Sequence, residues 1–430
     1  MSEHLTPRAG DTVTDANDAS TPTSPAGVAV LAFSGGLDTS YCALYLSKEC
    51  GYAVHTVTVN TGGFDAAALR EIEAHALRLG SARHVTLDRT QEFYDRCVRY
   101  LIFGNVLRGT VYPLSVSAER VFQAEAIAEY ARAHGASAIA HGSTGAGNDQ
   151  VRFDTVFHIL LPGVPVITPI RDHRLSREEE IAWLRGHGVE IDEHTAAYSI
   201  NRGLWGTSVG GRETLRSDLA LPEDAWPTQA TSDGSEEIEL HFRGGEPYGV
   251  NDRMEDTPVA AIRAVERIAS RYAIGRGMHV GDTIIGLKGR VGFEAAAPQL
   301  IIAAHRLLEK HTLTRQQQLI KDQLAITYGS LVHEAQFLEP AARDIERLFA
   351  HSQRSVSGSV RLLLAPYRFD LLGVRSDHDL MNADFGAYGE SHTLWTGDDV
   401  RGFSRILANP LMMYHAVNPR RNGGEEHDAR

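Results

Sequence analysis

The chain has 430 residues, enough for two or three domains, and its 42 Lys and Arg against 55 Asp and Glu give a formal net charge of −13. This acidic balance argues against tRNA or DNA as the main partner, because polyanions bind basic surfaces, although it leaves room for a local pocket that holds one nucleotide. Only three cysteines occur, without a CxxC pair, and we see no apolar run of the ~18–20 residues that span a bilayer and no signal-peptide core, so we expect a cytoplasmic protein with neither membrane nor nucleic-acid partners.

Both ends of the chain are predicted to be disordered tails. Residues 1–25 are rich in Ser, Thr, Asp and Pro, and residues 418–430 are similarly poor in large apolar groups. Such segments bury too little apolar surface to offset the entropy that is lost on ordering. We therefore expect the folded part of the chain between them.

Residues 26–196 are predicted to form a domain of the α/β class. Apolar, β-branched runs alternate there with segments of helical spacing. We expect strands over residues 28–33, 54–59, 84–87, 136–140 and 164–169, and helices over residues 39–50, 65–79, 117–134 and 176–184. The last helix begins at a capping box formed by Ser176 and Glu179. This alternation predicts βαβ units and a mainly parallel sheet that is covered by helices on both faces.

Residues 197–397 are predicted to form a second domain, of the α+β type. We expect a strand over residues 238–242, a hairpin over residues 360–365 and 368–374, and helices over residues 259–272, 299–310, 314–327 and 340–351. A last helix is expected over residues 398–417, with an apolar stripe through Val400, Phe403, Ile406, Leu407 and Leu411. This stripe fits either an ordinary packed helix or a helix that contacts another subunit.

The strongest local motif runs from Ala32 to Ser40, with the sequence Ala-Phe-Ser-Gly-Gly-Leu-Asp-Thr-Ser, and it joins the first strand to the first helix. Its glycines let backbone N–H groups approach a ligand closely, and its hydroxyl side chains add donors. The positive end of the helix points at the same loop. These groups predict a pyrophosphate cradle, although the motif is neither a Walker A sequence nor GxGxxG. The alternative is a strand-to-helix turn that uses small residues for packing.

A second glycine-rich loop follows the strand that ends at residue 140. The sequence His141-Gly-Ser-Thr-Gly-Ala-Gly-Asn-Asp-Gln-Val-Arg152 has three glycines within six residues, which cost conformational entropy. The polar cluster from Asn148 to Arg152 offers amide groups, a carboxylate for an ammonium and a guanidinium for a carboxylate. These groups suit amino-acid zwitterions held beside a nucleotide, and the alternative is a solvated polar loop. His141 is the one histidine near this loop, and we expect it to be structural or to contact a nucleotide rather than to bind a metal.

The first motif resembles the pyrophosphate loop of the ATP pyrophosphatase superfamily, and both motifs together resemble the argininosuccinate synthase family. Three further stretches agree with that family: Tyr-Pro-Leu-Ser-Val-Ser-Ala-Glu-Arg over residues 112–120, the paired-serine segment over residues 198–208 and Gly-Leu-Lys-Gly-Arg-Val-Gly-Phe-Glu over residues 286–294. The resemblance covers roughly residues 27–410.

The resemblance implies an ATP-dependent ligase of arginine biosynthesis that uses Mg²⁺. In this family the ureido oxygen of citrulline attacks the α-phosphate of ATP, which gives citrullyl-AMP and pyrophosphate, and the aspartate amine then displaces AMP. The first domain is implied to have the adenine nucleotide α-hydrolase-like fold. The second domain is implied to serve catalysis and assembly, and the last helix to reach a neighbouring subunit of a homotetramer.

The resemblance also assigns roles to residues of this chain. ATP is implied to be bound by Ala32, Phe33, Ser34, Gly35, Gly36, Leu37, Asp38, Thr39, Ser40, Val59 and Gly142. Aspartate is implied to be bound by Thr144, Asn148 and Asp149, and citrulline by Tyr112, Ser117, Asn148, Arg152, Ser199 and Ser208. The residues expected to matter most for the chemistry are Asp38, Asp149 and Arg152. We expect no metal site built from protein ligands alone, and expect Mg²⁺ on the ATP phosphates with Asp38. Taken alone, Tyr112 could be a half-buried aromatic, the two late serines turn hydroxyls and Arg152 part of a structural ion pair.

The chain departs from the family pattern at several positions. Ala146 stands where the family has Lys, and Asn201-Arg202-Gly203 where it has Asp-Glu-Asn. Gly281 aligns with the glutamate that meets the citrulline amino group, and Phe293 aligns with a tyrosine of the same site. We favour the interpretation that Asp282 supplies the missing carboxylate. The alternatives are an enzyme for an N-acylated citrulline, a misalignment of this segment, or a non-catalytic nucleotide-binding protein on the same fold.

Overall fold

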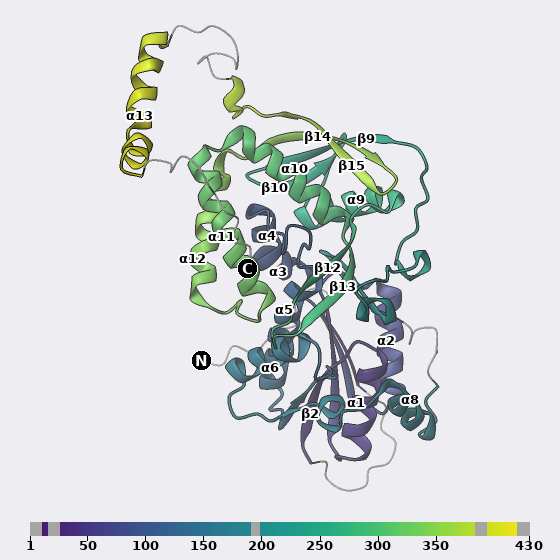
Figure 1. The fold of residues 1–430 in the computed structure, drawn as a ribbon. Coiled ribbons are helices and arrows are strands. Elements are labelled where there is room, and N and C mark those ends of the chain that lie inside the picture. Colours follow the sequence, from purple (N-terminus) through teal and green to yellow (C-terminus); the bar gives the residue numbers. More distant parts are fainter. Residues whose placement is uncertain (1–10, 16–25, 191–197, 383–393, 419–430) are drawn as a thin grey trace. The chain divides into compact units, whose positions relative to one another are not determined.

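The computed structural model describes residues 11–15, 26–190, 198–382 and 394–418 (Figure 1). Residues 1–10, 16–25, 191–197, 383–393 and 419–430 are outside this description. The chain divides into two compact units, Met1–His378 and Asp379–Arg430, and each is described by itself.

The first part of the larger unit is built on a six-stranded sheet. Its strand order is β1-β4-β3-β2-β5-β6, in which β2 to β6 are parallel and β1 pairs antiparallel with β4. The strands are β1 Thr12–Asp15, β2 Val28–Ala32, β3 Ala53–Asn60, β4 Arg83–Asp88, β5 Ala138–Ala140 and β6 Val166–Ile167. The prediction of a mainly parallel sheet in an α/β domain is confirmed.

Helices cover both faces of this sheet, as the continuous apolar runs of its strands predict. Because side chains alternate along a strand, Val30 and Ala32 of β2 join one apolar core while Leu31 and Phe33 join another. Figure 1 shows β2 between the two groups of helices, with α1 and α8 in one group and α5 and α6 in the other. The helices are α1 Leu37–Lys48, α2 Ala66–Arg78, α3 Thr90–Phe93, α4 Arg99–Phe103, α5 Ser115–Ala133, α6 Asp149–Leu160, α7 Pro169–His173 and α8 Arg177–Gly186.

The strand order places a switch in direction between β2 and β5, which are neighbours in the sheet. The chain leaves β2 toward one edge of the sheet and leaves β5 toward the other edge. In open α/β sheets, ligands bind at the carboxyl ends of the strands at such a switch point. The two glycine-rich loops follow these two strands, so the fold brings both predicted loops to this point.

Strand β1 corrects one prediction, because it lies inside the segment expected to be disordered. Thr12, Val13 and Thr14 are β-branched and pair with β4, which would otherwise be the edge strand of the sheet. The Asp11 carboxylate accepts hydrogen bonds from the Asp88 N–H and from Arg89 Nη1, both at 3.1 Å. Apart from residues 11–15 and Asn418, the two predicted tails lie outside the described residues.

The second part of the larger unit contains two antiparallel sheets and four long helices, so the predicted α+β character is confirmed. The sheet orders are β11-β10-β9-β14-β15 and β12-β13-β8-β7. The strands are β7 Tyr198–Gly203, β8 Gly206–Gly211, β9 Glu236–Arg243, β10 Glu246–Val250, β11 Arg253–Met254, β12 Arg276–Asp282, β13 Lys288–Glu294, β14 Gly358–Ala365 and β15 Arg368–Arg375. The helices are α9 Pro258–Ala269, α10 Ala296–Thr312, α11 Arg315–His333 and α12 Pro340–Ser352.

The smaller unit contains one long helix, α13 Gly397–Val417, which begins at a capping box made by Thr396 and Asp399. None of its residues is buried, and Phe403, Ile406 and Leu407 expose between 64% and 70% of their surface. The predicted apolar stripe is therefore present, and no described residue of the smaller unit covers it. Of the helices that the structure describes, none is both long and apolar enough to cross a membrane.

Candidate active site

The loop after β2 presents backbone donors at the start of α1. Gly36 is the N-cap of this helix and makes no side-chain cap, so the first N–H groups of α1 are not covered by a capping side chain. Gly35 has a φ of +77°, and a Cβ there would lie 3.3 Å from Ile72 Cγ1, so glycine fits both the turn and the packing. Thr39 Oγ1 donates to the Gly36 carbonyl at 3.2 Å and fixes the loop from inside.

Several residues predicted to contact ATP are instead buried beneath this loop, where they pack against the fold or hydrogen-bond to the loop backbone. Phe33 is 4% exposed and packs its ring against His75 and His84. Ser40 is fully buried, donates its hydroxyl to the Gly36 carbonyl at 2.8 Å, and lies 2.8 Å from His75 Nε2. Val59 is 5% exposed. The Ser40 hydroxyl, expected to face a ligand, is therefore engaged within the fold, whereas Ser34 and Gly36 are exposed.

Asp38, in the first turn of α1, meets a second carboxyl group from α8. Its side chain forms a hydrogen bond with Glu180, and burial raises the pKa of Asp38 while Arg177 opposes that rise. Burial and the nearby Asp38 raise the pKa of Glu180 to about 8. Two carboxyl groups in contact cannot both ionise easily, so the pair holds a proton at neutral pH.

The two glycine-rich loops touch each other. A Cβ on Gly142 would lie 3.1 Å from the Asp38 carbonyl carbon, so only glycine lets the second loop pack this closely on the first. His141 Nδ1 accepts from the Ser143 N–H at 3.2 Å, and its Nε2 therefore donates to Asp154 Oδ1 at 2.9 Å. His141 thus orients the start of the second loop, which agrees with the structural role expected for it.

The rest of the second loop is braced from α6 and α7. Arg171 Nη1 lies 2.6 Å from Asp154 Oδ2 and 3.3 Å from Gln150 Oε1. Gln150 Nε2 in turn donates to the Gly147 carbonyl at 3.2 Å. Thr144 lies at the exposed tip of this loop and takes no part in the contacts made by Arg171 and Gln150. The loop is therefore held from behind, and its outer edge stays open.

Asp149 is the centre of the polar cluster that follows this loop. Its Oδ2 accepts from Arg120 Nε at 2.9 Å and its Oδ1 from Arg152 Nη1 at 2.8 Å. Although burial favours the neutral acid, these two guanidinium groups lower the pKa of Asp149 to about 2. Arg120 also donates to Asn201 Oδ1 at 2.8 Å, and Arg152 donates twice to the His333 carbonyl at 3.0 Å. The Asp149 side chain stays 35% exposed and ionised.

Segments from the second part of the chain complete this cluster. The Asn148 Oδ1 accepts from the Ile284 N–H at 2.8 Å, so the tip of the β12–β13 hairpin rests on the second loop. Ser208 faces Asn201 in the β7–β8 register, and Ser199 lies two residues before Asn201 on β7. The structure thus brings the predicted residues Asn148, Asp149 and Arg152 together, with Ser208 on the strand beside Asn201 and Ser199 exposed on the same strand as Asn201.

The first turn of α5 lies next to this network. Leu114, its N-cap, has a φ of +64° and makes no side-chain cap. A non-glycine residue in this region is strained by on the order of 1–3 kcal/mol, and such strain clusters at functional sites. Ser117 donates its hydroxyl to the Leu114 carbonyl at 3.2 Å, and the Ser115 hydroxyl is buried without a hydrogen-bond partner among the described residues.

Tyr112 closes the cluster together with two aromatic rings from the β12–β13 hairpin. Its ring stacks on His279 with centroids 5.2 Å apart and lies 5.4 Å from Phe293. Asp282 does not join them: it is 64% exposed and pairs with Lys288 across the hairpin at 2.5 Å. The interpretation that Asp282 supplies a carboxylate to the pocket is therefore wrong, because strand alternation turns its side chain to the opposite face from His279.

Sequence reasoning missed three members of this network: Arg120, Asn201 and His333. Arg120 lay in a stretch that resembles the family's substrate segment, so the signal for it was present. Asn201 stands out in the sequence only as a departure from the family pattern. Nothing in the sequence pointed to His333, whose carbonyl group ends α11 and reaches Arg152 through the fold.

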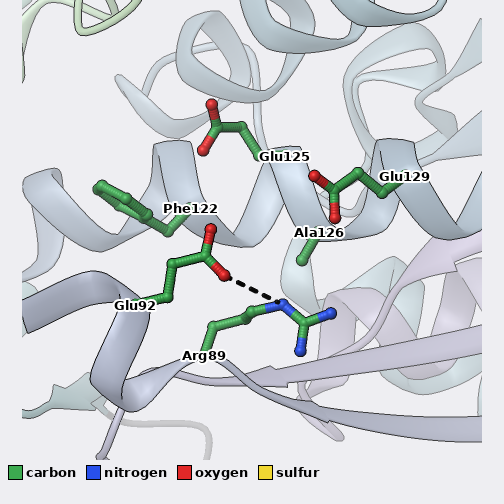
Figure 2. A pocket seen from close by; sticks show the side chains of 6 residues that line it. All are labelled: Arg89, Glu92, Phe122, Glu125, Ala126 and Glu129. Carbon is green, nitrogen blue, oxygen red and sulfur yellow. Dashed lines mark ion pairs between the residues drawn. The ribbon is translucent and has the colours of Figure 1, made fainter. Parts of the chain in front are cut away.

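A separate cavity lies between α3 and α5 (Figure 2). Its charged groups are already paired, since Arg89 Nε lies 3.8 Å from Glu92 Oε2 and Arg89 Nη1 lies 3.1 Å from Asp11 Oδ1. None of the predicted site residues lines it. The lining residues are Arg89, Glu92, Phe122, Glu125, Ala126 and Glu129.

Comparisons with known proteins agree along most of the chain. Residues 28–190 match the family model described as Arginosuccinate synthase N-terminal HUP domain, and residues 198–414 match the one described as Arginosuccinate synthase C-terminal domain. The argininosuccinate synthase of Xanthomonas campestris pv. campestris is 37% identical over 402 residues, which cover 90% of this chain and 98% of the relative. That of Methanocaldococcus jannaschii is 35% identical over 367 residues, which cover 84% and 92%.

Among solved structures, a chain described as a predicted subunit of tRNA methyltransferase from Methanocaldococcus jannaschii was found with a TM-score of 0.27 and 17% identity, covering 37% of this chain and 74% of that one. This likeness is too weak to bear on the fold or the function.

Proposed function

The chain belongs to the argininosuccinate synthase family, and from this premise we propose that its site joins citrulline to aspartate at the expense of ATP, as a step of arginine biosynthesis. The family predicted from the two glycine-rich loops is thereby confirmed. The observation that carries the proposal is the contact between these loops at Gly142 and Asp38, at the switch point of the sheet.

The loop after β2 suits the phosphates of ATP. The uncapped N–H groups at the start of α1 and the positive end of the helix attract an anion. Gly142 and its neighbours would approach the nucleotide from the second loop, and Val59, at the end of β3, would lie on the adenosine side. The hydroxyl of Ser34 adds a donor at the exposed rim of the first loop, while the half-buried Thr39 uses its hydroxyl to hold the loop through the Gly36 carbonyl.

The first step requires the ureido oxygen of citrulline to attack the α-phosphorus of ATP. A new carbon–oxygen–phosphorus link forms, and the bond from the α-phosphorus to the bridging oxygen breaks, which releases pyrophosphate. Negative charge spreads over the phosphate oxygens in this step, and fixed backbone donors stabilise it without reorganising. Holding both reactants in line lowers the barrier further.

In the second step the aspartate amine attacks the activated carbon, and AMP departs with the former ureido oxygen. Asp149 is held ionised by Arg120 and Arg152, yet it remains partly open. An ionised carboxylate in this setting attracts an ammonium group and can orient it. We therefore assign aspartate to Asp149, Asn148 and Thr144, and the ureido substrate to the side of Arg152, Tyr112, Ser117, Ser199 and Ser208.

The residues at the first loop also fit Mg²⁺. Among the described residues, no group of three or more His, Cys, Asp or Glu is placed to hold a metal ion. Asp38 and Glu180, however, present hard carboxylate oxygens that share a proton in the free protein. When bound, Mg²⁺ would neutralise charge on the phosphates, and Asp38 with Glu180 would contribute to holding it beside them.

Helix α13 supports a proposal about assembly. A single helix gains little stability in water by itself, and the described residues of its own unit do not cover Phe403, Ile406 and Leu407, so we infer that these side chains pack on a surface outside this unit. We propose that a neighbouring copy supplies this surface in a homotetramer. The double substitution Phe403→Glu and Ile406→Glu should lower the mass measured by light scattering. We also place the protein in the cytoplasm, in keeping with its three free cysteines.

The test of the proposed reaction is pyrophosphate release with ATP, Mg²⁺, a ureido amino acid and aspartate, omitting each in turn. We expect sustained release only in the complete mixture, with argininosuccinate or its acylated counterpart and AMP formed in equal amounts. Release that ignores both amino acids, or no release in any complete mixture, would contradict the proposal.

A further inference from the structure

Around Tyr112, the site is lined by the rings of Tyr112, His279 and Phe293, with Gly109 and Gly281 next to His279. Tyr112 is tied to Arg108 by two backbone hydrogen bonds of 2.8 and 3.0 Å, which close a short loop around Gly109. His279, on β12 of the hairpin, packs its ring against Tyr112 of this loop, and the two rings are nearly parallel, with an interplanar angle of 19°. Tyr112, His279 and Phe293 are all less than 10% exposed.

The position of His279 depends on Gly281. The two residues lie on the same face of β12, and a Cβ on Gly281 would lie 2.8 Å from His279 Nε2. The imidazole therefore occupies the volume that a side chain at residue 281 would need. Asp282 lies on the opposite face of β12 and is paired with Lys288. The side chain that β12 contributes to the site is therefore the His279 imidazole and not a carboxylate.

The charges around this ring are unfavourable for an ammonium group. Burial and the nearby Arg108 lower the pKa of His279, and burial with Arg152 and Arg108 lowers the pKa of His333 to about 2, so both imidazoles are neutral. Among the described residues, the carboxylates at this cluster already have cationic partners. Glu334 pairs with Arg108 at 3.3 Å, and Asp149, which pairs with Arg120 and Arg152, is the carboxylate assigned above to the ammonium of aspartate.

A desolvated ammonium that has no free carboxylate and lies beside guanidinium groups pays a large penalty. An amide nitrogen carries no charge and avoids that penalty, while its acyl group can lie against aromatic rings. We propose that His279 makes this end of the site specific for a citrulline whose α-nitrogen is acylated. The inference rests on the proposed function, since it takes the ureido end of the substrate to lie at the glycine-rich loops.

The direct test needs no variant. The kcat/KM values for citrulline and N-acetylcitrulline are measured by pyrophosphate release with ATP, Mg²⁺ and saturating aspartate. We expect N-acetylcitrulline to be preferred at least tenfold. Equal values, or a preference for free citrulline, would overturn the inference while leaving the proposed function in place. Turnover of neither compound would contradict the proposed function itself.

A pair of substitutions tests whether His279 sets this preference. His279→Ala combined with Gly281→Glu removes the ring and places a carboxylate in the space it filled, so it should raise kcat/KM for free citrulline at least tenfold and lower it for N-acetylcitrulline. The matched control is Asp282→Asn on the opposite face, which should leave the ratio of the two substrates within about twofold. A double variant that is folded by circular dichroism but keeps the original ratio, or a control that selectively loses citrulline, would overturn the assignment.

Discussion

Two polar networks in the larger unit contain similar groups and differ in how completely they are satisfied. In the first, Glu309 of α10 accepts hydrogen bonds from Asn105 and Gln353 and pairs with Lys321 of α11. His305 lies 2.7 and 2.8 Å from the side-chain oxygens of Asn105 and Gln353. The Lys321 and Glu309 side chains are no more than 5% exposed, so each acceptor of this carboxylate is engaged and no room is left for a ligand.

The second network surrounds Asp149 and also places a carboxylate among cationic donors. It differs because Asp149 remains 35% exposed and because its partners come from α5, α6, β7 and the end of α11. It therefore connects the elements that carry the predicted substrate residues. The buried network around Glu309 has all its polar groups paired and stabilises the fold, whereas the partly exposed network around Asp149 keeps a charge that an incoming group can reach.

The largest effect on stability is expected from breaking the closed network. Lys321→Ala leaves the Glu309 carboxylate buried without its cation, which typically costs about 3–5 kcal/mol of unfolding free energy. The turnover of the folded fraction should be unchanged, because this network does not touch the site. Urea denaturation measures the loss, and Lys288→Ala, which breaks an exposed ion pair, is the matched control with little expected change. A similar small change for both variants would contradict the distinction drawn here.

Glu119 lies between these two cases, because it is buried like Glu309 yet has no direct salt-bridge partner among the residues that the structure describes. Thr61 donates to its Oε2, its Oε1 has no hydrogen-bond partner among the described residues, and burial raises its pKa to about 7. Between its unfolded pKa near 4.5 and pH 7 the folded protein keeps a proton that the unfolded chain has released. Stability should therefore fall as the pH rises through this window, by at most about 3 kcal/mol.

Glu119→Gln should remove this pH dependence and be more stable than the parent protein at pH 8. Unfolding free energies measured in urea between pH 5 and pH 8 provide the test. Glu178→Gln, at an exposed position of α8, serves as the control and should follow the parent curve. Parallel curves for the Glu119 variant and the parent protein would show that Glu119 does not hold the proton.

Substitution of the centre of the open network should affect chemistry more than stability. Asp149→Asn keeps the shape and hydrogen-bonding capacity of the side chain but removes the charge that attracts the aspartate ammonium. We expect kcat/KM for aspartate to fall about 100-fold, equivalent to about 2.7 kcal/mol. Positional isotope exchange in ATP, measured with the ureido substrate but without aspartate, should fall much less. Equal losses in both measurements would mean that Asp149 serves both steps or the fold.

The smallest of these effects is expected where the two glycine-rich loops meet. Gly142→Ala would place a Cβ 3.1 Å from the Asp38 carbonyl carbon, so one loop must shift by a few tenths of an ångström. We expect the KM for ATP to rise about tenfold, or about 1.4 kcal/mol, with little change in the KM for aspartate. Gly186→Ala, where a Cβ meets open space, is the control. A Gly142 variant with an unchanged KM for ATP would place the nucleotide elsewhere.

Local sequence patterns were enough to predict the parallel strands, the start of α8 and the two glycine-rich loops. Continuous β-branched runs predicted the parallel strands, and the capping box at Ser176 predicted the start of α8. Loop-forming glycines after β2 and β5 predicted the two halves of the site, because parallel strands bring their carboxyl ends to one edge. The sheet order that makes β2 and β5 neighbours was needed to show that these loops touch.

Other features depended on contacts between distant segments. The β12–β13 hairpin carries glycines and charged residues and lacks a clear apolar alternation, so it was not predicted as strands. The strand register decides that Asp282 faces solvent and His279 faces Tyr112, and a register cannot be read from composition. The link from Arg152 to the His333 carbonyl joins residues 181 positions apart, which no local pattern could indicate.

The central claim is that the ureido oxygen is activated by transfer of AMP and then leaves with it. The most direct measurement uses a ureido substrate labelled with ¹⁸O at the ureido oxygen, in unlabelled water, with ATP, Mg²⁺ and aspartate. Mass spectrometry should find one ¹⁸O in each AMP formed and none in pyrophosphate. AMP that carries no label, formed together with the ligated product, would contradict the account.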